Sequence, residues 1–112
     1  MKIDPKTAIA TILKQYFENK VETEYRFHAK RRWRFDWAIP SEMMAIEYEG
    51  GIFNAKSRHF SGMGAVRDCE KYRHAAMAGW CVLRYSVKDF NELDRDLAEM
   101  IGFGNLPRKI KK

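Results

Sequence analysis

Two short runs of alternating apolar and polar residues, 32–39 and 43–49, lie on either side of a Pro-Ser pair. Alternation with a period of two is typical of strands that place one face on a core, so the runs predict an antiparallel hairpin. The expected core face of the first run carries Trp33, Phe35, Trp37 and Ile39. The opposite face carries acid, with Asp36 in the first run and Glu47 and Glu49 in the second.

The register of this hairpin decides which acids face each other. A two-residue loop of Ser41 and Glu42 places Asp36 opposite Glu47, and a loop longer by two residues places it opposite Glu49. In both registers the three carboxylates share one face, where directly opposed Cβ atoms lie about 4.5–5.5 Å apart. Like charges at that distance destabilise a fold. A bound Mg²⁺, which favours carboxylates, water and phosphate oxygens, would remove the repulsion.

The alternative interpretation is a solvated strand face whose acids pair with Arg32 or Arg34. The charge of the whole chain adds a second observation, because 21 Lys and Arg against 15 Asp and Glu give a net charge of +6. Basic residues gather in 29–34, 56–59 and 107–112. Such clusters favour a polyanionic partner, since contacts with phosphates release condensed counterions. Basic segments beside metal-binding acids together predict metal-assisted phosphodiester hydrolysis.

The rest of the chain predicts a mixed α/β domain with the element order α-β-β-β-α-β-α. A first helix is expected to begin at the N-cap Asp4 and Pro5. Residues 21–28 alternate as a strand, and 80–86 begin with a nearly continuous apolar run that favours a central strand. The last helix is expected after Ser86, which resembles the start of a capping box.

Between the hairpin and the last strand, residues 50–65 contain four glycines and predict a long loop. A helix over about 66–78 follows. Its inward face is expected to hold Val66, Cys69, Tyr72 and Ala76. Cys69 and Cys81 both lie in apolar contexts, so they are predicted to be buried free thiols.

At 112 residues the chain is expected to form one domain, residues 1–104, followed by a basic tail, residues 105–112. No apolar run reaches the roughly 20 residues that a membrane span needs. The first residues do not resemble a signal peptide. We therefore expect a cytoplasmic protein without a membrane partner.

Four short motifs, in this order, resemble the PD-(D/E)XK nuclease superfamily. That family's restriction-endonuclease-like core is a helix, a three-stranded meander, a helix and a strand. RFDWAIP holds Asp36, and AIEYEGG holds Glu47 and Glu49, where the family has an acid and then acid-x-lysine. RDCEKY and GWCVLR, within 67–86, resemble the pattern of small phage and bacterial endonucleases. These are similar to very-short-patch repair endonucleases and Holliday-junction resolvases, and the resemblance covers about residues 5–90.

The resemblance implies a DNA endonuclease that depends on Mg²⁺, with Mn²⁺ able to substitute for it. The metal ligands would be Asp36, Glu47 and the backbone carbonyl of Tyr48, and Glu49 would complete this site or hold a second ion. Contacts to the phosphates of DNA would come from Arg31, Arg32, Arg34, Lys56 and Arg58.

One departure from the family motif is that Glu49 stands in place of its lysine. That lysine is thought to position or activate the attacking water, so another residue would have to take its role. Lys71 on the following helix is the first candidate, and the alternative for it is a solvated side chain paired with Asp68. His59 in the glycine-rich loop is a further candidate, as a general acid or base near neutral pH.

The sequence is also compatible with two other functions. A non-catalytic nucleic-acid-binding module on the same fold would explain the missing lysine. An RNase has the same sequence features as a DNase. Cleavage of both strands of a duplex, or symmetric resolution of a junction, would require a homodimer.

Overall fold

The computed structural model describes residues 3–50 and 62–103, which form a small α/β domain. Its helices and strands are α1 (Pro5–Phe17), β1 (Glu22–Arg26), β2 (Arg34–Ile39), β3 (Met44–Glu49), α2 (Gly62–Met77), β4 (Cys81–Ser86) and α3 (Leu93–Gly102). The four strands make one open sheet in the order β1-β2-β3-β4, with β3 and β4 parallel and the other pairs antiparallel. The predicted element order and the mixed sheet are therefore confirmed.

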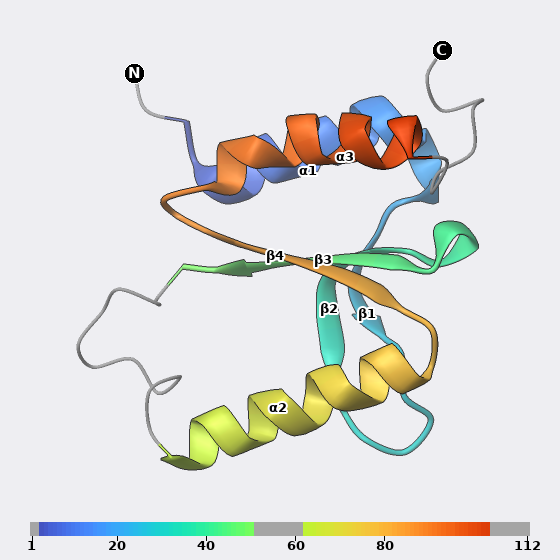
Figure 1. The fold of residues 1–112 in the computed structure, drawn as a ribbon, viewed down its shortest axis with the longest axis vertical. Coiled ribbons are helices and arrows are strands. Elements are labelled where there is room, and N and C mark those ends of the chain that lie inside the picture. The colour runs from blue at the N-terminus through green and yellow to red at the C-terminus, as the bar shows by residue number, and fades with distance from the viewer. Residues whose placement is uncertain (1–2, 51–61, 104–112) are drawn as a thin grey trace.

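Helices α1 and α3 cover one face of the sheet and α2 covers the other (Figure 1). Helix α1 begins as its sequence predicts, because the Asp4 side chain accepts a hydrogen bond from the Thr7 N–H at 3.0 Å and Pro5 follows the cap. The main core lies between these two helices and the sheet. Its fully buried large side chains include Ile9, Leu13, Ile39, Met44, Ile46, Leu93 and Leu97.

The inward face of α2 differs from the predicted one. Three of the predicted inward residues are exposed: Val66, Cys69 and Ala76. The residues that face the sheet are Ala75, which is fully buried, and the half-buried Lys71 and Tyr72. The helix has this orientation because Lys71 and Tyr72 both contact the buried acid Glu47 on β3. The apolar pattern of the helix therefore gave the wrong face.

The hairpin of β2 and β3 has the first of the two predicted registers. Trp37 pairs with Ile46, which brings Asp36 level with Glu47. The connection is longer than the predicted pair of residues, because the short 3-10 helix Pro40–Glu42 is followed by Met43 with a left-handed φ of 51°.

The alternation of side chains along β2 breaks down at Asp36. Phe35 was expected on the same face as Trp37, but it is buried on the α2 side while Trp37 packs toward α1 and α3. The pairing of β2 with β3 ends at Trp37, and Glu24, the residue of β1 level with Asp36, has a φ of 50°. Because a non-glycine residue with this φ is costly, its presence beside Asp36 marks a locally strained level of the sheet.

Strand β4 is an edge strand of the described sheet and not the predicted central strand. Its apolar pattern reflects two covered faces, since Val82 packs on the α2 side and Leu83 on the side of α1 and α3. Cys81 at the start of this edge strand and Cys69 on the outer side of α2 are exposed, so the predicted burial of both thiols is wrong. In the part of the chain that the structure describes, no helix has the length and apolar character to cross a membrane.

Candidate functional site

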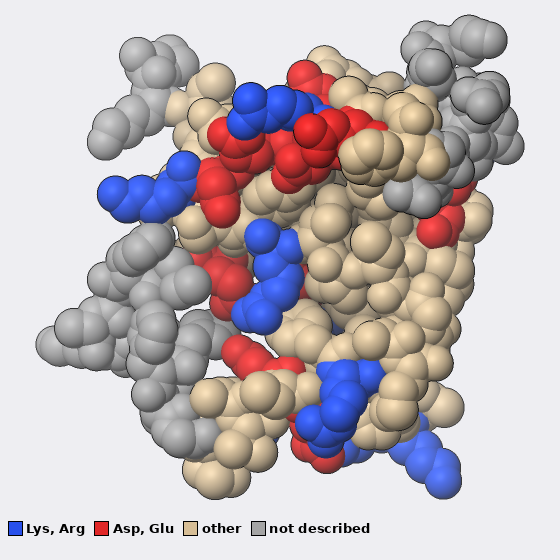
Figure 2. Space-filling model, in the orientation of Figure 1, with Lys and Arg blue, Asp and Glu red and all other residues tan. Residues whose placement is uncertain are grey.

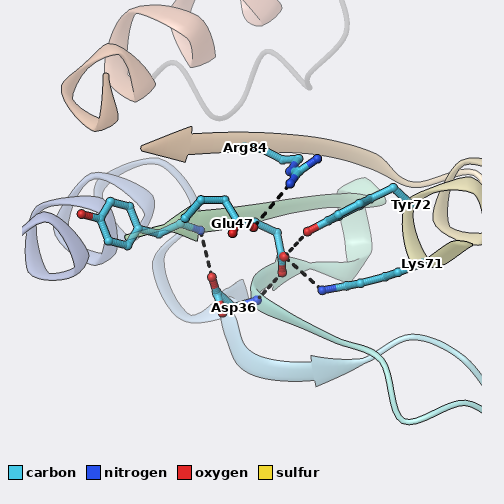
Figure 3. A network of polar contacts seen from close by, with 7 residues as sticks. Asp36, Glu47, Lys71, Tyr72 and Arg84 are labelled. Carbon is cyan, nitrogen blue, oxygen red and sulfur yellow. Dashed lines mark hydrogen bonds and ion pairs between the residues drawn. The ribbon is translucent and has the colours of Figure 1, made fainter. Parts of the chain in front are cut away.

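The acids Asp36 and Glu47 meet where the pairing of β2 with β3 ends (Figure 3). The Asp36 N–H donates to Oε2 of Glu47 at 3.0 Å, and the Tyr48 N–H donates to Oδ2 of Asp36 at 2.8 Å. Each carboxylate thus accepts a backbone N–H of the opposite strand. These two bonds hold the acids side by side at one level of the sheet.

Glu47 is the buried charged residue of the site, with 4% of its surface exposed. Its Oε1 accepts a hydrogen bond from Nζ of Lys71 at 3.0 Å and a short one from the Tyr72 hydroxyl. Both donors project from α2 toward the carboxylate (Figure 3). Burial of an unpaired carboxylate costs several kcal/mol. The ammonium, the hydroxyl and the Asp36 N–H offset that cost, so α2 is fixed to the sheet through this one acid.

The environment of the site raises the pKa of two of its groups. Burial raises the pKa of Asp36, the Tyr48 N–H lowers it in part, and the charge of Glu47 raises it further. Burial first, and then the charge and hydrogen bond of Glu47, raise the pKa of Tyr72, so its hydroxyl stays a proton donor over the whole accessible pH range. Burial is thus the main cause of the raised pKa of Asp36, and the charge of Glu47 adds to it.

A second acid and a second cation lie on the α2 face of the sheet in addition to Glu47 and Lys71. Arg84 on β4 lies 3.6 Å from Oε2 of Glu49, and its guanidinium lies 4.2 Å from the centre of the Tyr72 ring. Tyr72 also has the Lys71 ammonium 5.1 Å from its ring centre. Acids on β3 thus alternate with cations from α2 and β4 around one tyrosine.

A hollow of about 300 Å³ opens at the carboxyl ends of β3 and β4. Its lining residues are Glu49, Arg84, Tyr85, Ser86 and Asp89. Glu49 and Arg84 therefore belong both to this hollow and to the group of charges around Tyr72, whereas Asp36 and Glu47 are not among its lining residues.

The structure brings together two of the three predicted acids, Asp36 and Glu47, with the predicted Lys71, while Glu49 contacts Arg84. Lys71 contacts Glu47 and has only 15% of its side chain exposed, so the alternative of a solvated Lys71 is wrong. The alternative of a solvated acidic face is wrong for Glu47, whose cationic partner is Lys71 and neither Arg32 nor Arg34. Glu49 is also mostly covered, with 13% of its side chain exposed.

The arginines predicted to contact DNA are not part of the site around Asp36 and Glu47. Arg31 makes two hydrogen bonds to Glu70, at 3.0 and 3.1 Å, and lies 4.0 Å from the centre of the Trp33 ring. Arg32 and Arg34 are exposed. Lys56, Arg58 and His59 lie outside the described residues.

Charge is unevenly spread over the face shown in Figure 2. Acidic side chains gather over α3, and basic side chains are scattered over the rest of the face (Figure 2). The acidic residues of α3 are Asp94, Asp96 and Glu99.

Two residues of the site, Tyr72 and Arg84, were not among the predicted functional residues. Both lie in segments that carry the resemblance, RDCEKY and GWCVLR. An arginine inside an otherwise apolar strand segment was the available signal for Arg84, because such a charge requires a partner. For Tyr72 the pattern suggested only a core residue.

The resemblance predicted metal ligands at Asp36, Glu47, Glu49 and the backbone carbonyl of Tyr48. Within residues 3–50 and 62–103, no group of three or more His, Cys, Asp or Glu side chains is arranged to hold a metal ion. Searches of family models, curated proteins and solved structures found no match to this chain.

Proposed function

We propose that this chain is a metal-dependent endonuclease that hydrolyses phosphodiester bonds of DNA, on a restriction-endonuclease-like fold. The observation that carries the proposal is the buried Glu47, bonded to Lys71 at 3.0 Å and level with the half-buried Asp36. Two acids and a lysine are the residue types that the resemblance assigns to the active site. The order of the helices and strands supports the same fold.

The donor set fits Mg²⁺ because all three proposed ligands are hard oxygens, from Asp36, Glu47 and the carbonyl of Tyr48. A carboxylate has about four acceptor positions, and the described donors to Glu47 are the Asp36 N–H, Lys71 and Tyr72. For Asp36, the hydrogen bonds from described residues reach Oδ2 and leave Oδ1 to another partner. The raised pKa of Asp36 supports the fit, because a cation would offset the negative charge that causes part of the rise.

The side chains have separate roles in this proposal. A bound Mg²⁺ would supply Lewis-acid stabilisation of the charge that develops on the phosphodiester under attack by water. Asp36 and Glu47 hold the ion, and Lys71 keeps the Glu47 carboxylate oriented while its ammonium lies beside the acids. The Lys71 ammonium is then the group that positions the attacking water or the phosphate through a hydrogen bond that it donates. Tyr72 stays protonated and fixes Glu47 from the other side.

A second candidate, a non-catalytic nucleic-acid-binding module, is favoured by a specific contact. Glu49 occupies the place of the family's lysine and lies 3.6 Å from Arg84. Salt bridges of this kind can preserve a fold without any metal. This candidate predicts salt-sensitive DNA binding that Glu47→Gln leaves intact, and no product with any metal.

The test is a cleavage assay with the full chain and five substrates: single-stranded, duplex, mismatched and branched DNA, and RNA. Each is incubated with Mg²⁺, with Mn²⁺ or with EDTA. We expect cleavage of at least one DNA with either metal, no product in EDTA, and loss of cleavage in Asp36→Ala. Glu99→Ala, which removes an exposed acid of α3, is the control and should cleave normally.

The outcomes separate the candidates. Circular dichroism must show that Asp36→Ala is folded. Cleavage of RNA alone would assign an RNase. Tight DNA binding without any product would assign the binding module, and equal cleavage by Asp36→Ala would overturn the proposed site.

A further inference from the structure

We propose that Arg84 is a phosphate-binding residue, which in the hollow beside the acid pair exchanges its contact with Glu49 for a phosphate oxygen of the nucleic acid. This inference rests on the proposed function and deepens it. It assigns Arg84 to substrate binding and leaves the chemistry to Asp36, Glu47 and Lys71.

The contact between Arg84 and Glu49 is weak enough to be exchanged. The nearest N–O distance is 3.6 Å, longer than a hydrogen bond, and 45% of the Arg84 side chain is exposed. A long ion pair with one half-exposed partner contributes less to stability than a short, fully buried pair. A guanidinium binds a phosphate through two parallel hydrogen bonds, which are stronger than such a long contact.

The place of Arg84 is nevertheless fixed relative to the acids. Its guanidinium carbon lies 4.2 Å from the centre of the Tyr72 ring, a cation–π distance. The hydroxyl of the same tyrosine donates to Glu47, which in turn accepts the N–H of Asp36. Because Tyr72 links the guanidinium to the acid pair, a phosphate on Arg84 would be held beside the proposed metal ligands (Figure 3).

The hollow around Arg84 has the other features that such a ligand needs. It has a volume of about 300 Å³ and lies at the ends of β3 and β4. The acid Asp89 also lines it, but the Asp89 carboxylate accepts the N–H of Ser86 at 2.6 Å and the hydroxyl of Ser86 at 3.1 Å. These two hydrogen bonds hold the Asp89 carboxylate against Ser86. Glu49, after the exchange, can join the metal site in which the proposed function places it.

A second hollow in the described residues provides the matched control. It measures about 390 Å³ and its lining includes Arg95 together with Glu92 and Asp94 on the acidic side of α3. Arg95 is also exposed and paired with a glutamate, Glu92, but the described residues that line its hollow include no lysine. Substitution of Arg84 and of Arg95 therefore removes the same type of side chain from two different surroundings.

The experiment measures binding of a fluorescein-labelled 20-nucleotide DNA, single-stranded and duplex, by fluorescence anisotropy in EDTA, where no cleavage occurs. The chains compared are wild type, Arg84→Ala, Arg84→Lys and Arg95→Ala. We expect Arg84→Ala to raise Kd about tenfold and to lower the slope of log Kd against log salt by about one for duplex DNA. Arg84→Lys should recover part of the lost affinity, since it keeps the positive charge but cannot form two parallel hydrogen bonds to a phosphate. The Kd of Arg95→Ala should stay within about twofold of wild type.

The failure of this inference can be told from the failure of the proposed function. If wild type binds DNA and Arg84→Ala binds with the same Kd and the same salt slope, the inference is overturned, whatever the cleavage assay gives. It is also overturned if wild type binds neither DNA, or if Arg95→Ala loses as much affinity as Arg84→Ala. The proposed function is judged separately, by cleavage with Mg²⁺ or Mn²⁺. Thermal melting of each variant checks that a lost affinity does not come from lost folding.

Discussion

Glu47 and Asp36 lie at the same level of two neighbouring strands, and Oε2 of Glu47 accepts the backbone N–H of Asp36 at 3.0 Å. The side chain of one acid thus takes the place of a strand-to-strand bond at the other acid. The regular pairing of β2 with β3 ends here, and the Glu47 carboxylate is bonded to Lys71 and Tyr72 of α2. Strain at Glu24, with its φ of 50°, lies at the same level.

The first prediction concerns the pH dependence of stability through Asp36. The pKa of Asp36 in the folded protein is raised above its ordinary 3.8, mainly by burial. The folded state therefore binds this proton more tightly than the unfolded state does, and ionisation of Asp36 destabilises the fold. The cost is absent below pH 3.8, where both states are protonated, and is complete above the raised pKa.

In metal-free buffer, Asp36→Asn should therefore become more stable relative to wild type as the pH rises through this window. Urea unfolding of both chains at several pH values between 3.5 and 7 measures the difference. The amide can still accept the Tyr48 N–H, so that bond is kept. A stability difference that does not change with pH would contradict the raised pKa.

The second prediction concerns the ion pair of Lys71 and Glu47. Lys71→Met leaves the buried carboxylate without its cation and should lower the free energy of unfolding by about 3 kcal/mol. Glu47→Gln should also destabilise, because it leaves a mostly covered ammonium unpaired. The double variant should be more stable than the sum of the two losses predicts, by at least about 1 kcal/mol. Urea unfolding of the four chains gives the coupling energy, and additive losses would show that the contact is not formed in solution.

The third prediction concerns the hydroxyl of Tyr72. Tyr72→Phe removes the hydrogen bond to Glu47 and keeps the ring beside Arg84. Since the lost bond ends on a charged group, the variant should be destabilised by about 2 kcal/mol. Mn²⁺ should bind more tightly to this variant than to wild type, because a donor that competes with the ion for Glu47 is gone. Calorimetric titration of Mn²⁺ measures the affinity; weaker binding would mean that the hydroxyl positions Glu47 for the ion.

The sequence predicted the parts of the fold that depend on local pattern. The cap at Asp4, the period of two along β3 and the register that sets Asp36 level with Glu47 follow from the spacing of residues near one another in the chain. Side chains at consecutive positions of β3 alternate as a regular strand requires, whereas the alternation of β2 breaks at Asp36. The acid pair could therefore be found before any tertiary contact was known.

The errors came where polar contacts decide the packing. The apolar residues of α2 predicted an inward face with Val66, Cys69, Tyr72 and Ala76. Of these only Tyr72 faces the sheet, and Lys71 lies beside it. The cost of burying the Glu47 carboxylate without hydrogen-bond donors is larger than the gain from burying a weak apolar stripe of α2. The spacing of apolar residues in the sequence carries no information about that cost. The same reason explains why Tyr72 and Arg84 were missed. The apolar run of β4 likewise arises because both faces of this strand are covered, although the strand lies at the edge of the sheet.

The last prediction concerns the effect of Mg²⁺ on stability, a readout that needs no substrate. If Mg²⁺ binds between Asp36 and Glu47, it should raise the free energy of unfolding by about 1.4 kcal/mol at ten times its Kd. The gain should be lost in Asp36→Asn and kept in Glu99→Gln, which changes an exposed acid of α3. It should also shrink as the pH falls through the raised pKa of Asp36, because the protonated acid is a poor ligand. Urea unfolding with Mg²⁺ and with EDTA, at pH 7 and at pH 4, measures all of these effects. Equal stabilisation of wild type and Asp36→Asn would place the ion elsewhere on the molecule, and no stabilisation of wild type even at high Mg²⁺ would count against a metal site at this acid pair.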